Sequence, residues 1–83
     1  MDKKASFGKV LAQVMEENGM SQKRLAKESG VSQAYVSRII SGYVKDPTFA
    51  KARAMLNALD VDLDDFAARQ ERYEYEVVSL NEE

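Results

Sequence analysis

The side chains that carry out most enzyme chemistry are scarce in this 83-residue sequence, which contains neither cysteine nor histidine. Their absence removes disulfides, thiolate nucleophiles, imidazole acid–base catalysis and zinc sites built from those ligands. The neighbouring acids Asp64 and Asp65 are the candidates for a metal site. Carboxylates in the first turn of a helix are stabilised by the helix dipole, so we interpret this group as a helix start rather than a metal site. We therefore expect a protein that is not an enzyme and that uses no metal and no cofactor.

The size and composition predict one small domain with a packed core, since 45% of the 83 residues are hydrophobic. No apolar run approaches the roughly 20 residues of a membrane-spanning helix. The first residues, MDKKASFG, lack the apolar core of a signal peptide. We therefore expect a cytoplasmic protein with no membrane partner.

Charge is distributed unevenly along the chain, although the formal net charge is only −2. Residues 1–59 hold ten Lys/Arg and five Asp/Glu, whereas residues 60–83 hold two Lys/Arg and nine Asp/Glu. A phosphate group responds to the charge of the face that it meets, not to the charge of the whole chain. The basic body is therefore compatible with a nucleic-acid partner, despite the sequence pI of about 5.2.

The stretch over residues 22–42 has the pattern of two helices joined by a tight turn. Gly30 can adopt the positive φ that ends the first helix and reverses the chain, and Ala26 is small enough for two helices to cross closely. Ser32 follows as an N-cap for the second helix. The apolar residues that would set the angle between the helices are Leu25, Val31, Val36 and Ile39.

Apolar residues at helical spacing predict one helix before this motif and two after it. The predicted elements are helices over Ser6–Asn18, Gln22–Ser29, about Gln33–Ser41 and Phe49–Leu59, and a fifth that begins near Asp62 or Leu63. Ser6, Ser21 and Thr48 are the expected N-caps of the first, second and fourth helices. Asp60 is expected in the turn conformation after the fourth helix, where glycine would be easiest.

The sequence beyond Gln70 fits two kinds of element. Tyr73, Tyr75 and Val77 occupy alternate positions, as in a strand, whereas Phe66, Gln70, Tyr73 and Val77 recur at helical spacing. A lone terminal strand needs an edge, so a strand here would pair with another chain. Three alternatives stay open for this tail: a disordered or frayed helical extension, a strand or helix that forms a homodimer, and a docking site for a different protein.

With the motif on its second and third helices, the chain resembles the lambda-repressor-like family of small bacterial and phage regulators, also called the Cro or XRE type. The resemblance runs from about Phe7 to Phe66, and the segments that carry it are GMSQKRLAKESGVSQAYVSRI, Pro47-Thr48-Phe49 and LNALDVDLDDF. It implies an all-α, five-helix DNA-binding domain over residues 1–70, followed by an acidic tail over residues 71–83. It also implies that the third helix lies in the major groove of double-stranded DNA.

The resemblance implies roles for individual side chains. By matching position, the residues that face base edges are Gln33, Ala34, Ser37 and Arg38. Gln33 would bond adenine bidentately, Ala34 would touch a thymine methyl group, and Arg38 would bond guanine. The implied phosphate contacts are Gln22, Lys23, Tyr35, Tyr43, Lys45 and Phe49. Lys51 is expected to be plain charged surface, as are Lys3, Lys4 and Lys27.

Domains of this kind and size usually bind DNA as two-fold dimers. The expected dimer surface consists of Phe66, Tyr73, Tyr75, Val77 and Leu80. The resemblance therefore implies a transcriptional regulator, in the first place a repressor of phage, plasmid or mobile-element type that binds a palindromic operator as a homodimer. The alternatives are an antitoxin or restriction-modification controller whose tail binds a partner, and a protein-interaction module that keeps the fold without binding DNA.

Overall fold

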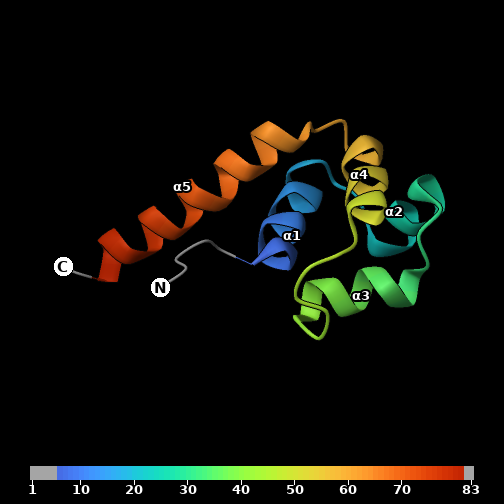
Figure 1. Cartoon of the computed structure of the whole chain (residues 1–83), viewed down its shortest axis with the longest axis horizontal. Coiled ribbons are helices and arrows are strands. Elements are labelled where there is room, and N and C mark those ends of the chain that lie inside the picture. Colours follow the sequence, from blue (N-terminus) through green and yellow to red (C-terminus); the bar gives the residue numbers. More distant parts are fainter. Residues whose placement is uncertain (1–5, 82–83) are drawn as a thin grey trace.

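The computed structural model describes residues 6–81, and it describes side chains as far as Arg72. The elements in this range are α1 (Phe7–Glu17), α2 (Gln22–Ser29), α3 (Gln33–Ser41), α4 (Phe49–Ala58) and α5 (Leu63–Asn81), arranged as Figure 1 shows. The predicted all-α, five-helix fold is confirmed. In the part of the chain that the structure describes, none of the helices combines the length and apolar character needed to cross a membrane.

Side-chain oxygens start the helices where the sequence predicted them. The hydroxyls of Ser6, Ser21, Ser32 and Thr48 accept hydrogen bonds from backbone N–H groups three residues ahead, at 3.2, 3.1, 3.1 and 3.3 Å respectively. Asp62 starts α5 in the same way, because its Oδ1 accepts from the backbone N–H of Asp65 at 2.8 Å. Each such cap satisfies an N–H that has no partner inside its helix.

Left-handed residues lie at or just after the ends of four helices, and Gly19, after α1, has a φ of 62°. Gly30 and Gly42 end α2 and α3 with φ of 76° and 87°. Asp60 has a φ of 57° after α4, as predicted, and is the one non-glycine residue with positive φ in the described range. α4 itself ends one residue earlier than predicted, at Ala58, and Leu59 is its C-cap.

One apolar core joins all five helices. Its buried members are Phe7, Val10, Leu11, Val14, Met15, Leu25, Val31, Val36, Ile39, Ala52, Met55, Leu56, Leu59 and Phe66. The ring centroids of Phe7 and Phe66 lie 4.5 Å apart, so the first turns of α1 and α5 are packed together. This contact fixes where α5 leaves the body of the protein.

The start of α1 packs directly on the end of α3. A Cβ placed on the buried Gly8 would overlap the carbonyl oxygen of Ile39 and lie 3.1 Å from the Cα of Ile40. Only a residue without a side chain permits this approach. Sequence reasoning assigned Gly8 no role, because its partner lies in another helix.

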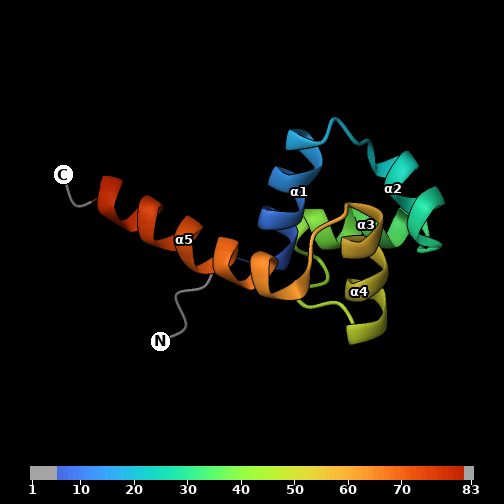
Figure 2. The same ribbon diagram turned by 90° about the horizontal axis from the view of Figure 1, so that it is seen from above.

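α5 continues as one 19-residue helix and projects away from the other four helices (Figures 1 and 2). The strand considered for the tail is therefore wrong for its described part. A helix satisfies its own backbone hydrogen bonds, whereas a lone strand here has no edge to pair with. The expected boundary at residue 70 falls within this continuous helix. Residues 82–83 lie outside the described range.

Candidate nucleic-acid interface

α2 and α3 form a compact pair that presents one face of α3 to solvent. Leu25 of α2 and Val36 of α3 are fully buried, and Val31 in the turn between the helices is 8% exposed. The turn is held by the side chain of Ser29, whose Oγ accepts from the backbone N–H of Val31 at 3.2 Å. The orientation of α3 therefore follows from packing in the core and from local hydrogen bonds.

The four residues expected at base edges all lie on the exposed side of α3. Gln33, Ala34, Ser37 and Arg38 are exposed, whereas Val36 and Ile39 on the opposite side of the helix are buried. An exposed face with Gln, Ser and Arg can donate and accept several hydrogen bonds, and its alanine leaves room for close approach. Side chains of these types can form hydrogen bonds and apolar contacts with base edges in a DNA groove.

The C-terminal end of α3 is held in place next to Arg38. The carbonyl oxygen of Arg38 accepts from the backbone N–H of Val44 at 3.0 Å and from the hydroxyl of Ser41 at 3.1 Å. Ser41 Oγ in turn accepts from the backbone N–H of Tyr43 at 3.4 Å. These bonds stabilise the turn that connects α3 to the following loop.

The expected phosphate contacts surround α3 from three segments of the chain. Gln22 and Lys23 begin α2, Tyr43 and Lys45 lie in the loop after α3, and Phe49 begins α4. Tyr43 and Phe49 are large hydrophobic residues, yet they are 82% and 69% exposed. Gln22 is half-buried, and Lys23 and Lys45 are exposed.

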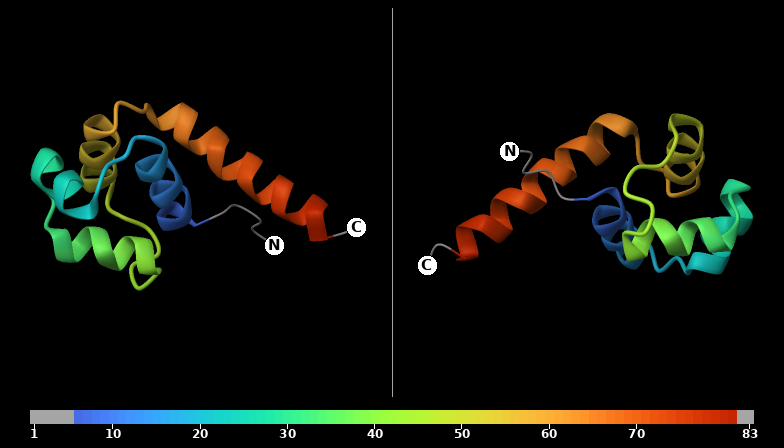
Figure 3. Two further views of the ribbon diagram at one scale, coloured as in Figure 1. Left: turned by 180° about the vertical axis from the view of Figure 1, so that it is seen from behind. Right: turned by 60° about the horizontal axis from the view of Figure 1, so that its bottom comes forward.

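The positive charges of Arg38 and Lys45, on and next to α3, are available to an anionic ligand. The ion pairs among the described residues are Arg24 with Glu28 and Arg69 with Glu17, so neither uses Arg38 or Lys45. The acid-rich α5 begins on the far side of α1 from α3 and then projects sideways from the bundle (Figures 1 and 3). α1 therefore lies between α3 and the start of α5.

A comparison with protein-family models finds a match over residues 11–66 to a family described as helix-turn-helix. This range contains α2, α3 and α4 whole, together with residues 11–17 of α1 and the first turn of α5, residues 63–66. The chain belongs to this helix-turn-helix family. A comparison with curated proteins found no match. The lambda-repressor-like resemblance is therefore confirmed, and with it the function of a DNA-binding transcription regulator.

The helix-turn-helix domain also contains a contact that the sequence did not predict. The Nζ of Lys51, in the first turn of α4, lies 4.1 Å from the centroid of the Tyr35 ring in α3. Tyr35 is half-buried and Lys51 is exposed. The sequence pattern treats Lys51 as plain charged surface, and no local signal reveals its partner, because the two residues belong to different helices.

The expected dimer surface needs one correction. Phe66 is 2% exposed and packs on Phe7 within its own chain, so it is a core residue and not part of an exposed surface. An apolar ring at the start of α5 is buried because α1 passes directly beneath it. The other four residues expected there, Tyr73, Tyr75, Val77 and Leu80, belong to α5, but their side chains lie outside the described ones.

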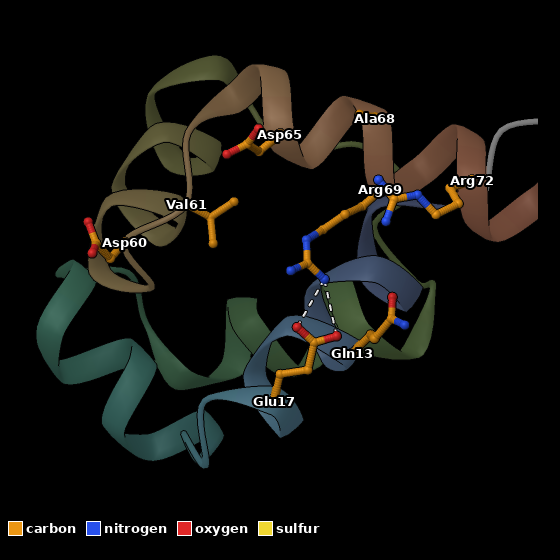
Figure 4. A pocket seen from close by; sticks show the side chains of 8 residues that line it. All are labelled: Gln13, Glu17, Asp60, Val61, Asp65, Ala68, Arg69 and Arg72. Carbon is orange, nitrogen blue, oxygen red and sulfur yellow. Dashed lines mark hydrogen bonds and ion pairs between the residues drawn. The ribbon is translucent and has the colours of Figure 1, made fainter.

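A groove of about 590 Å³ separates α1 from α5, away from the exposed face of α3 (Figure 4). It is lined by Gln13, Glu17, Asp60, Val61, Asp65, Ala68, Arg69 and Arg72. Arg69 reaches across it, and its Nη1 lies 3.0 and 3.1 Å from the two carboxylate oxygens of Glu17. Because both side chains are partly exposed, this pair contributes about 1 kcal/mol or less to stability.

The acidic residues at the start of α5 act as the sequence suggested. Asp62 caps the helix, and Asp64 and Asp65 lie in its first turn, where the helix dipole favours negative charge. Among the described residues, no group of three or more His, Cys, Asp and Glu side chains is arranged to hold a metal ion.

Proposed function

We propose that this protein is a repressor that binds a palindromic operator as a homodimer. The observation that carries the proposal is the exposed face of α3, on which Gln33, Ala34, Ser37 and Arg38 stand together beside basic and aromatic surface residues. Bound at a promoter, such a protein would block access of RNA polymerase.

Three of the four side chains on that face each suit a different base. The amide of Gln33 can bond adenine N6 and N7, and the guanidinium of Arg38 can bond guanine O6 and N7. Ala34 offers a methyl group to thymine, and Ser37 can donate or accept. Together they would select a short sequence in the major groove.

Contacts with phosphates would set the register of α3 in the groove. Lys23, Tyr43 and Lys45 are exposed around α3, and the first N–H groups of α2 and α4 point away from their helices, as at any helix start. Such contacts position the protein and make binding depend on salt, but they do not choose the sequence.

A homodimer would place two copies of α3 in successive major grooves, about 34 Å apart. We propose α5 as the dimer element. Its C-terminal half extends beyond the bundle, and residues 73, 77 and 80 recur at helical spacing on it. Tyr75 does not share that spacing. It would therefore contribute less to a dimer formed by helices than to one formed by paired strands.

Selection of binding sites from random duplex DNA tests the base contacts. We expect the wild type to enrich a two-fold symmetric motif, and the Gln33→Ala/Arg38→Ala variant to lose it. Lys27→Ala serves as the control, because Lys27 is an exposed lysine on α2 for which no DNA contact is proposed. If the double variant enriches the same motif as the wild type, these residues do not read the operator.

A separate measurement is needed to decide whether the protein represses or activates transcription. The selected motif, placed over a promoter, should reduce transcription by purified polymerase in the presence of the wild type and not in the presence of the double variant. An increase would instead identify an activator.

A further inference from the structure

The contact between Tyr35 and Lys51 links α4 to α3, the helix that is proposed to contact base edges and is called the reading helix below. Lys51 is the third residue of α4, and its backbone N–H donates to the N-cap Thr48. Tyr35 is the third residue of α3, and its N–H donates to the N-cap Ser32 at 3.1 Å. Both side chains thus come from first turns that are held by their own caps.

The ring of Tyr35 restricts where the ammonium group of Lys51 can lie. A lysine cation at 4.1 Å from a ring centroid is within the range of a cation–π interaction. A free lysine loses much of its rotamer freedom when it binds a phosphate. Lys51 is already partly ordered, so it would lose less.

The surroundings of this pair favour an anion. The first turns of α3 and α4 carry the positive ends of two helix dipoles. Neither ion pair among the described residues includes Lys51. The contact given for its ammonium group is the one with the ring of Tyr35. Tyr35 also stands directly beside Ala34, one of the residues proposed to face a base.

We propose that Lys51 binds a phosphate of the DNA backbone next to the reading helix, and that Tyr35 positions it. This inference rests on the proposed function. It adds Lys51 to the DNA contacts and makes Tyr35 a positioning residue that acts through Lys51.

The test measures equilibrium affinity by fluorescence anisotropy, on the selected operator and on a random duplex, across a range of salt concentrations. Lys51→Gln should weaken binding to both duplexes and reduce the slope of log affinity against log salt by about 0.9, the value for one neutralised phosphate. Lys51→Arg should retain the slope. Lys27→Gln removes the same charge from α2 and should leave the slope unchanged.

Tyr35 is tested through its coupling to Lys51. Tyr35→Leu should weaken binding about two- to fivefold in the wild-type background, the range expected for a cation–π contact, and hardly at all in the Lys51→Gln background. Tyr35→Phe keeps the ring and should keep most of the affinity. Thermal melts establish whether each variant is folded. If Tyr35→Leu is not folded, a clear loss of affinity in Tyr35→Phe or a reduced salt slope in Lys51→Arg would still contradict the inference.

Several results would overturn the inference. An unchanged salt slope for Lys51→Gln would show that Lys51 binds no phosphate, while wild-type operator binding would leave the proposed function intact. Fully additive effects of Tyr35→Leu and Lys51→Gln would show that Tyr35 does not position Lys51. Failure of the wild type to bind either duplex would overturn both the inference and the proposed function.

Discussion

At the scale of single residues, Gly8 shows how a contact between helices can reverse a local preference. Alanine is normally favoured over glycine inside a helix by about 1 kcal/mol. At Gly8, however, the added Cβ would lie 2.8 Å from the carbonyl carbon of Ile39 and overlap its oxygen. The helices can avoid this overlap only by moving apart.

We therefore expect Gly8→Ala to destabilise the protein by about 1–3 kcal/mol, the range for overpacking a close contact. Urea denaturation measures the change. Lys9→Ala is the matched control, because Lys9 is the next residue of α1 and is exposed. It should change the free energy of unfolding by less than about 0.5 kcal/mol. A Gly8→Ala protein more stable than the wild type would show that α1 and α3 do not approach this closely.

At the scale of elements, α5 divides into a packed half and a projecting half. Phe66 is the last residue of α5 in the buried core, and the ion pair of Arg69 with Glu17 lies just beyond it. The rest of the helix extends past the body (Figure 2). Its proposed role as a dimer element can therefore be separated from its role in folding.

Removing residues 73–83 should convert the proposed dimer into a folded monomer. The shortened chain keeps every residue of the buried core, so its circular dichroism should still report a helical domain with cooperative unfolding. Sedimentation equilibrium measures the mass, and the affinity for the palindromic operator should fall because two half-sites are no longer bound together. If the shortened chain remains a dimer, the interface lies elsewhere. If the full-length protein is a monomer, α5 is instead a candidate surface for a different partner.

At the scale of the whole molecule, a basic body is joined to an acidic end. Residues 73–83 carry four of the chain's fourteen acidic residues and no Lys or Arg, and they hold the formal net charge at −2. Acidic groups at this end of the chain would repel DNA that approaches without facing α3. Such repulsion would weaken random binding more than operator binding, because the operator is proposed to lie against α3.

Replacing Glu74, Glu76, Glu82 and Glu83 by Gln changes the formal net charge from −2 to +2. We expect this variant to bind random duplex DNA more tightly at low salt, and the difference to shrink as salt is raised, since screening shortens the range of the repulsion. The sequence selected from random DNA should remain the same. Equal random-DNA affinity at low salt would rule out a role for the acidic end in discrimination.

The sequence by itself determined the local features of this protein. Helices, caps and left-handed turns depend on residues within one turn of each other, which is why the sequence alone predicts the cap at Ser32 and the turns at Gly30 and Asp60. The exposed face of α3 follows from helical periodicity in the same way. These residues lie within the range 11–66 that matches the helix-turn-helix family.

Only the tertiary structure decided which residues from different helices meet. Gly8 against Ile39, Phe66 against Phe7, and Lys51 over Tyr35 all join segments that are distant in sequence. Their partners depend on the packing angles of whole helices, which arise from the complete core rather than from any one segment. The described part of the tail, residues 71–81, continues α5 for a different reason: a helix satisfies its own backbone hydrogen bonds, whereas a strand needs a neighbouring strand, and the described chain provides none.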